Sequence, residues 1–305
     1  MAAASRVSVI SSFFNAEDFL AECVQSVLEQ DFADLELILV DDGSEDRSSQ
    51  IALSFAASDE RVRYLEHPGH QNRGTCASRN LGLRESSSEL VAFIDADDRW
   101  RPLKLRQQLE IMDQMPDVDA VCGAVNFWAS HAGGNDETIA TGHVFNRAIA
   151  APEGLLNIYP LGKADPPCPS DLLMRRTIVE AIGGFEESFT GPLQLYEDQA
   201  FLAKFFLEGT LFCSDQVWLD YRVHDRSCTS EVVRSGLQPE VRRHCLEWFE
   251  NYLASSIHRD DPRVRSALLQ SLRPYRHPFS SAVANGLQRV ASAIRPTSLR
   301  RKRAA

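Results

Sequence analysis

The chain has 305 residues, of which 44% are hydrophobic and 25% charged, a composition typical of a globular protein with a substantial core. No run approaches the roughly 18 apolar residues of a membrane-spanning helix, and the first residues are too few and too polar for a signal peptide. Seven scattered cysteines, never in Cys-x-x-Cys spacing, favour reduced thiols in a cytoplasmic protein over a disulfide framework or a zinc site.

Charge is distributed unevenly along the chain. Residues 262–305 contain ten Arg or Lys and no acidic residue, whereas residues 1–261 contain 22 basic and 43 acidic residues, a net charge of −21. The basic tail has two interpretations: peripheral contact with the anionic inner face of the cell membrane, or a solvated segment that docks, if at all, on the acidic body. The acidic body, which lacks aromatic residues interleaved with basic ones, argues against a nucleic-acid partner.

The first half of the chain alternates strand and helix patterns, as in a parallel sheet covered by helices on both faces. Helices are expected after Asn15, which is predicted to cap the first with Asp18 in a capping box, and after Ser44, predicted to cap the second. Strands are expected at 6–11, 35–40, 61–65, 90–94 and 120–127, and further helices at 74–84, 103–115, 197–207 and 236–256.

Two of the predicted strands end in carboxylates. Asp41 and Asp42 follow the second strand, and Asp95, Asp97 and Asp98 follow the fourth. Because the carboxyl ends of parallel strands share one edge of a sheet, both clusters are expected to face one crevice. Crowded carboxylates favour a neutralising cation, and hard oxygen ligands suit Mg²⁺ or Mn²⁺ beside a phosphate-bearing ligand. The alternative is that each cluster is an acidic turn that caps the next helix.

An ordered set of short motifs resembles the family 2 glycosyltransferases, which have the nucleotide-sugar-binding GT-A fold. The motifs are Val7-Ser-Val-Ile10, Val40-Asp-Asp-Gly-Ser-Glu-Asp46, Asn72-Arg-Gly74, Ala77-Ser-Arg-Asn-Leu-Gly82, Ala92-Phe-Ile-Asp-Ala-Asp-Asp98, Ser170-Asp-Leu-Leu-Met174, Ile182-Gly-Gly-Phe-Glu186, Glu197-Asp198 and Tyr221-Arg-Val-His224. The resemblance implies an α/β fold, with a mostly parallel, Rossmann-like GT-A sheet flanked by helices in a catalytic domain at residues 1–230. Residues 231–305 are then expected to be a helical C-terminal extension.

The resemblance also implies a binding site for the nucleotide-sugar donor. It gives Asp41 the nucleobase contact, with Asp42 as its neighbour or as a helix cap, and it places Asp95 near the ribose. Phe14 stands where the family usually has tyrosine, and is expected to stack on the base. Arg79 either supports the donor site or forms a buried salt bridge to an aspartate.

A divalent cation, Mn²⁺ or Mg²⁺, is the cofactor that the resemblance implies. Asp97 is its expected main ligand, and Asp95 and His224 are further candidates. His224 is alternatively a contact to the diphosphate, or a structural residue with no part in the site.

Asp198 is the expected general base, because the resemblance assigns that role to the Glu-Asp pair; Glu197 is the second choice. The alternative is that both are ordinary dipole partners at a helix N-terminus. The predicted function is metal-dependent, inverting transfer of a single sugar from a nucleotide-sugar, UDP-linked by family precedent, to a hydroxyl of a glycan, lipid-linked or protein acceptor. A nucleotidyltransferase and a non-catalytic nucleotide-sugar-binding partner subunit are the alternatives.

Beyond the resemblance, the helix at 236–256 carries Val241, Cys245, Trp248 and Phe249 at helical spacing. It is expected to pack on the catalytic domain or on a second subunit, in which case the protein would be a homodimer.

Overall fold

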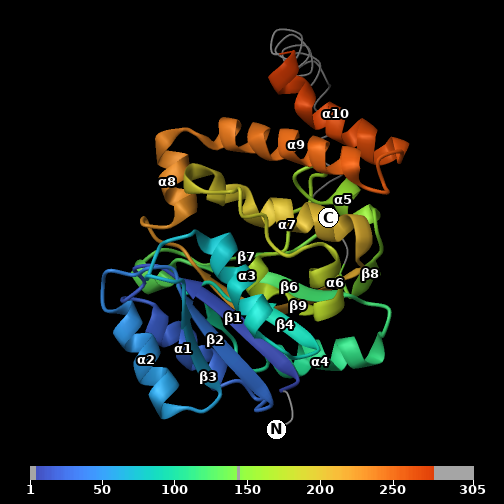
Figure 1. The fold of residues 1–305 in the computed structure, drawn as a ribbon. Coiled ribbons are helices and arrows are strands. Elements are labelled where there is room, and N and C mark those ends of the chain that lie inside the picture. Colours follow the sequence, from blue (N-terminus) through green and yellow to red (C-terminus); the bar gives the residue numbers. More distant parts are fainter. Residues whose placement is uncertain (1–4, 143–144, 278–305) are drawn as a thin grey trace. The chain divides into compact units, whose positions relative to one another are not determined.

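The computed structural model describes residues 5–142 and 145–277, and the chain divides into two compact units, residues 1–245 and residues 246–305 (Figure 1). The division falls inside helix α9, so the predicted domain boundary at residue 230 stays a prediction.

The first unit is built on one ten-stranded sheet in the order β3-β2-β1-β4-β9-β6-β10-β5, with β7 beside β6 and β8 beside β10. Its strands are β1 (Val7–Phe13), β2 (Leu35–Asp41), β3 (Val62–Glu66), β4 (Leu90–Phe93), β5 (Arg99–Trp100), β6 (Ala120–Trp128), β7 (Glu137–Ile139), β8 (Arg147–Ile149), β9 (Leu173–Arg175) and β10 (Leu211–Arg222). The predicted α/β class is confirmed. The sheet is parallel from β3 to β4 and mixed beyond it, where β9 runs antiparallel to both β4 and β6.

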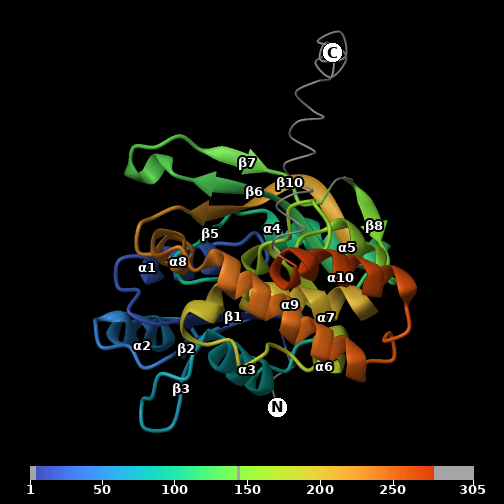
Figure 2. The same cartoon turned by 90° about the horizontal axis from the view of Figure 1, so that it is seen from above.

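Helices cover both faces of this sheet (Figure 2). Alternate β1 residues explain why: Val7 and Val9 join Leu20 and Leu105 in the core on one face, whereas Ile10 meets Gly82 on the other. The helices are α1 (Leu20–Leu28), α2 (Ser48–Ser58), α3 (Thr75–Glu85), α4 (Lys104–Gln114), α5 (Glu153–Asn157), α6 (Arg176–Ala181), α7 (Glu197–Glu208) and α8 (Cys228–Ser235), with 3₁₀ turns at Ser130–Ala132, Pro169–Asp171 and Gly191–Tyr196.

The register of the parallel strands brings their carboxyl ends to one edge. Phe13 pairs with Asp41 across β1 and β2, and Ile10 pairs with Phe93 across β1 and β4. The loops that carry Asp42, Asp95 and Asp97 therefore leave the sheet side by side, as expected.

The two predicted helix caps are wrong. Helix α1 begins at Leu20 and α2 at Ser48, and neither has Asn15 or Ser44 at its N-cap. Asn15, in a left-handed conformation with φ 50°, accepts a hydrogen bond from the backbone N–H of Glu45 at 2.8 Å, and Ser44 Oγ accepts one from the backbone N–H of Asn15 at 3.1 Å. Their polar side chains are used to join two loops, so they do not cap helices.

Two further helices complete the described chain, α9 (Gln238–Ser255) and α10 (Pro262–Arg276). The helix expected at 236–256 is confirmed, while its packing partner stays a prediction. Asp261 caps α10 by accepting the backbone N–H groups of Arg263 and Val264. The basic residues beyond 277 lie outside the described part. None of the described helices is long and apolar enough to cross a membrane.

Candidate active site

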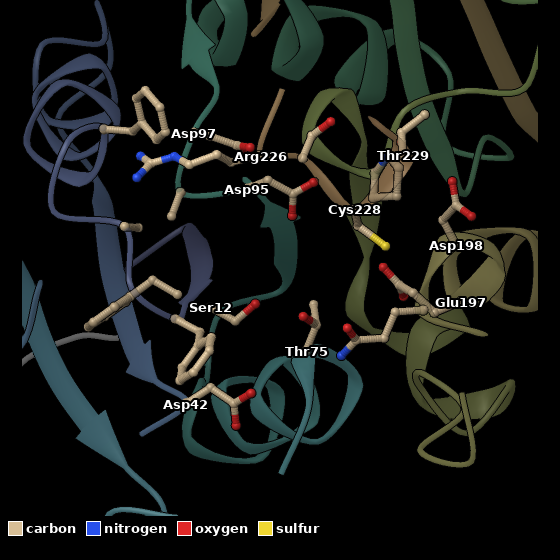
Figure 3. A pocket seen from close by; sticks show the side chains of 18 of the residues that line it. Ser12, Asp42, Thr75, Asp95, Asp97, Glu197, Asp198, Arg226, Cys228 and Thr229 are labelled. Carbon is tan, nitrogen blue, oxygen red and sulfur yellow. The ribbon is translucent and has the colours of Figure 1, made fainter. Parts of the chain in front are cut away.

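A cavity of about 620 Å³ opens at the carboxyl edge of β1, β2 and β4 (Figure 3). Its volume lies within the roughly 300–1,000 Å³ typical of small-molecule sites. Helix α7 and the segment after β10 supply the rest of its wall. The predicted site residues that line it are Phe14, Asp42, Arg79, Asp95, Asp97, Glu197, Asp198 and His224.

Asp41 is the predicted site residue that does not line this cavity. Its carboxylate is fully buried and accepts hydrogen bonds from the backbone N–H of Ser44 at 2.8 Å, the Ser49 hydroxyl at 2.5 Å and the Tyr64 hydroxyl at 3.1 Å. These bonds fasten β2 to α2 and β3. A contact between Asp41 and the nucleobase stays a prediction. Of the two adjacent carboxylates, Asp42 is the one that lines the cavity.

Asp42 holds the start of α3 against the end of β2. It accepts hydrogen bonds from the backbone N–H groups of Arg73 at 2.8 Å and Gly74 at 3.0 Å, and from the Ser78 hydroxyl at 3.0 Å. The close approach of the two loops requires glycine at position 43, where φ is 82° and a Cβ would lie 2.7 Å from Asn72 N. Phe14, 48% exposed, presents its ring on the same cavity.

Arg79 is buried between two carboxylates, Asp95 and Glu197, and forms an ion pair with each. The buried salt bridge to an aspartate is thus present, with Glu197 as an additional partner, while support of the donor site by Arg79 stays a prediction. Burial opposes the charge of Arg79, but the two carboxylates outweigh it and raise the Arg79 pKa. Burial raises the pKa of Glu197, and Arg79 opposes this shift. Arg79 thus ties the loop after β4 to the first turn of α7, and it occupies Glu197, the second candidate for the base.

Asp97 and His224 are neighbours on the cavity wall, with Asp97 Oδ2 2.9 Å from His224 Nε2. His224 Nδ1 is buried and has no hydrogen-bond partner among the described residues. Arg222 fixes this loop by donating from Nε to the backbone carbonyl of Asp97 at 2.7 Å, and its backbone N–H donates to Asp98 Oδ1 at 3.0 Å.

In the described part of the chain, no three His, Cys, Asp or Glu side chains are grouped so as to hold a metal ion. Asp95 is engaged by Arg79, which leaves Asp97 and His224 as the pair nearest to a ligand set. Mg²⁺ and Mn²⁺ are commonly held by one or two carboxylates together with substrate phosphates and water, so Asp97 has the donor chemistry for such an ion. His224 would have to exchange its hydrogen bond to Asp97 for a bond to the metal.

Asp198 has the electrostatic environment of a general base. Burial, and then the negative charge of Glu197, raise the pKa of Asp198 to about 7. Its Oδ1 accepts the backbone N–H of Gln199 at 2.6 Å. Figure 3 shows Asp198 on the opposite side of the cavity from Asp42, with Thr75 and Glu197 between them in the view. A base whose pKa lies near neutrality both accepts and releases a proton readily.

Residues 226–231 form a part of the wall that was not predicted from the sequence. Arg226 pairs with Asp18 at 2.5 Å and lies over the Phe19 ring, which closes one side of the cavity, and Ser227 caps α8. The sequence does contain a signal for helix α8: Ser227, a residue type favoured at helix N-caps, precedes an amphipathic stretch of eight residues. Lining residues elsewhere in the chain that were not predicted include Ser12, Thr75 and Gln194.

The sequence profile of "Glycosyl transferase family 2" matches residues 8–183, more than half of the chain. The chain belongs to glycosyltransferase family 2. The predicted family and the predicted enzyme class, glycosyltransferase, are therefore confirmed at the level of the family.

Curated relatives carry the same class name. The chain is 41% identical over 108 residues to the putative teichuronic acid biosynthesis glycosyltransferase TuaG of Bacillus subtilis, a match that covers 35% of this chain and 41% of the relative. It is 27% identical over 259 residues to glycosyltransferase GlyG of Streptococcus pneumoniae, which covers 82% of this chain and 80% of the relative. The chain thus spans less than half of TuaG.

Solved structures share the fold of this family 2 member. S. aureus TarS 1-349 in complex with UDP-GlcNAc superimposes with a TM-score of 0.67 at 18% identity, covering 89% of this chain and 73% of that one. Mannosyltransferase PcManGT from Pyrobaculum calidifontis, in complex with GDP-Man and Mn²⁺, gives a TM-score of 0.51 at 16% identity, covering 94% and 81%. At these identities the likeness concerns the fold alone.

Proposed function

We propose that this family 2 protein transfers a single sugar from a UDP-linked nucleotide-sugar to a hydroxyl of a glycan, lipid-linked or protein acceptor, with inversion at the anomeric carbon. The observation that carries the proposal is Asp198, a carboxylate with a pKa of about 7 on the cavity wall opposite Asp42. The UDP and UDP-GlcNAc complexes of TarS support a nucleotide-sugar donor, and the name of TuaG supports polysaccharide biosynthesis.

The chemistry follows from the two sides of the cavity. On the donor side, the exposed Phe14 ring is available for stacking on the base, near the Asp42 carboxylate. On the opposite side, Asp198 takes the proton of the acceptor hydroxyl as its oxygen bonds to the anomeric carbon. The bond from that carbon to the diphosphate breaks at the same time, and the nucleoside diphosphate leaves. Because attack and departure occur on opposite faces of the sugar, the configuration inverts.

Asp97 and His224 are the residues that we propose to hold a divalent cation. When bound, Mg²⁺ or Mn²⁺ supplies positive charge to the diphosphate as its negative charge grows. Arg79 keeps Asp95 and Glu197 in place whether or not the cation is present, because it is paired with both.

The decisive experiment compares Asp198→Asn with the matched control Asp117→Asn, a change of the same chemistry at an exposed carboxylate outside the cavity. UDP release from a panel of UDP-sugars should fall about 10²- to 10⁴-fold in D198N, as expected for loss of a general base, and stay near wild type in D117N. Calorimetric UDP binding should persist in both. Unchanged turnover in D198N would refute Asp198 as the base.

The donor and the cation are tested together by thermal unfolding. A ligand that binds only the folded state raises the melting temperature by mass action. UDP with Mn²⁺ should stabilise the wild type more than either alone, and this gain should disappear in Asp97→Ala. If no nucleoside diphosphate raises the melting temperature, with or without Mn²⁺, the nucleotide-sugar donor is excluded.

For the whole protein we propose a cytoplasmic location with peripheral contact to the inner face of the cell membrane. This proposal rests on the ten basic residues and the absence of acidic ones in residues 262–305. Whether α9 pairs with a second subunit stays a prediction.

A further inference from the structure

A second cavity of about 590 Å³ lies beside the edge strand β5, and it shares no lining residue with the first. Helix α1, the chain around β5, and residues near the ends of β6 and β10 supply its walls. Figure 2 shows β5 near α1 and the β6–β7 ribbon projecting beside β10. Neither the donor site nor the proposed base uses any residue of this cavity.

The second cavity is built around one buried carboxylate. Asp220 is 3% exposed; its Oδ2 accepts Arg99 Nη2 at 2.8 Å, and its Oδ1 accepts Arg101 Nη2 at 2.8 Å. Asn126 donates a further bond to Oδ1 at 2.9 Å. These bonds hold the guanidinium groups of two arginines whose side chains remain 37% and 42% exposed. A buried acid that orients two partly exposed arginines preorganises donors toward the cavity.

The rest of the wall combines hydrogen-bond donors, hydrogen-bond acceptors and an aromatic ring. Arg99 lies over the Trp128 ring at 4.0 Å, and Gln25 of α1 and Glu29, which follows this helix, are exposed at the cavity. The carboxylates of the wall outnumber its arginines, which disfavours a phosphate or other anionic ligand. The arginines in turn disfavour a metal ion. Hydroxyl groups, which both donate and accept, match such a mixed set of planar polar side chains.

We propose that this cavity binds neutral sugar residues of an oligosaccharide, separately from donor turnover in the first cavity. Arg222 separates the two cavities: its guanidinium lies 4.4 Å from the Trp128 ring on one side and 5.1 Å from the Phe19 ring, which lines the first cavity, on the other. Its backbone N–H and Nε also hold the Asp97–Asp98 loop.

The test uses saturation-transfer difference NMR with three neutral probes, maltotriose, cellotriose and chitotriose. Gln25→Trp places an indole at the exposed rim of the cavity, and Gln50→Trp makes the same change on the exposed face of α2. At least one probe should give signals with the wild type and Q50W, and its affinity should be about tenfold weaker with Q25W. Arg101→Glu, checked for folding by circular dichroism, should weaken binding of the same probe as well.

The proposal would be overturned by the absence of a signal from all three probes, or by equal affinity in wild type, Q25W and R101E. D198N separates this inference from the proposed function, because it should lose donor turnover and keep the oligosaccharide signals. Oligosaccharide binding that is lost in D198N but kept in Q25W would place the sugar in the first cavity and refute the second.

Discussion

At the scale of single residues, the surroundings of each carboxylate around the first cavity decide what it can do. Asp95 and Glu197 share the buried Arg79, whereas Asp198 forms no ion pair with any described residue. Asp41 and Asp42 are adjacent in sequence, but one fastens α2 and the other fastens α3. Residue type alone therefore does not separate a structural carboxylate from a reactive one.

The pH dependence of turnover should report Asp198. The base acts only when deprotonated, so turnover should rise with pH through about 7, where the pKa of Asp198 lies, and level off above it. Glu197→Gln removes the neighbouring negative charge that raises this pKa, so the midpoint should move to lower pH. Initial rates across a pH series would measure both midpoints. An unmoved midpoint in E197Q would contradict the coupling of the pair.

Removal of Arg79 should destabilise the fold more than removal of a surface arginine. Arg79→Ala leaves Asp95 and Glu197 as uncompensated charges around a buried site, a loss of about 3–5 kcal/mol for a broken buried pair. The loss should shrink as the pH falls, because burial raises the pKa of Glu197 and protonation removes its uncompensated charge. Urea unfolding of R79A would measure it, with Arg84→Ala on the exposed face of the same helix as control. Equal losses in both would argue against the ion-pair account.

At the scale of elements, α3 packs closely on the sheet because Gly82 has no side chain. A Cβ at this position would lie 2.5 Å from Ile10 Cγ2 and 3.3 Å from Val40 Cγ2. Since α3 also carries Arg79, this contact helps to set the position of the ion-paired site.

Gly82→Ala should therefore be destabilising, although alanine favours helices. Overpacking typically costs about 1–3 kcal/mol, more than the gain in helix propensity of roughly 1 kcal/mol. Glu85→Ala at an exposed position of α3 should change stability little. Thermal unfolding of the two variants would distinguish them, and a melting temperature of G82A at or above wild type would show that the helix can shift away from β1.

Long elements with clear periodicity could be predicted from the sequence, and short ones could not. The predicted strands and the helices at 74–84, 103–115 and 236–256 have counterparts within a few residues. Strand β5 has two residues and exists because Trp100 and Arg99 pair with Leu219 and Asp220. Such an element gains its stability from partners distant in sequence, so a local window has no signal for it.

At the scale of the whole molecule, strand ends and motif order predicted that the carboxylates Asp42, Asp95 and Asp97 would face one crevice, and all three line the first cavity. The segment after β10 could not be predicted as part of the wall, because Arg226, Ser227 and Thr229 carry no sequence pattern that points to a cavity. Their position becomes apparent only once β10 is paired with β6. The direction in which the Asp41 side chain points could not be predicted from the sequence either. It depends on hydrogen bonds from Ser49 and Tyr64, which lie 8 and 23 residues away in the chain.

The basic tail gives a prediction for the full chain. Residues 278–305 contain six Arg or Lys and no acidic residue, so they should add attraction to anionic lipid of about 1 kcal/mol per basic residue near the surface. The full chain should co-sediment with phosphatidylglycerol vesicles at low salt more than a chain ending at His277, and high salt should abolish the difference. Equal co-sedimentation of the two chains would show that residues 278–305 do not contribute to membrane binding.

The wall segment between Tyr221 and Glu231 has a consequence for how such enzymes diversify. Seven of the residues that line the first cavity come from this one stretch: Tyr221, His224, Arg226, Ser227, Cys228, Thr229 and Glu231. It begins in the last residues of the long strand β10, where Tyr221 pairs with Phe127 of β6, and continues into α8. An exchange of this short cassette between related chains would therefore alter much of the binding surface while the scaffold stays constant, which makes it a natural unit for recombination and for the redesign of selectivity.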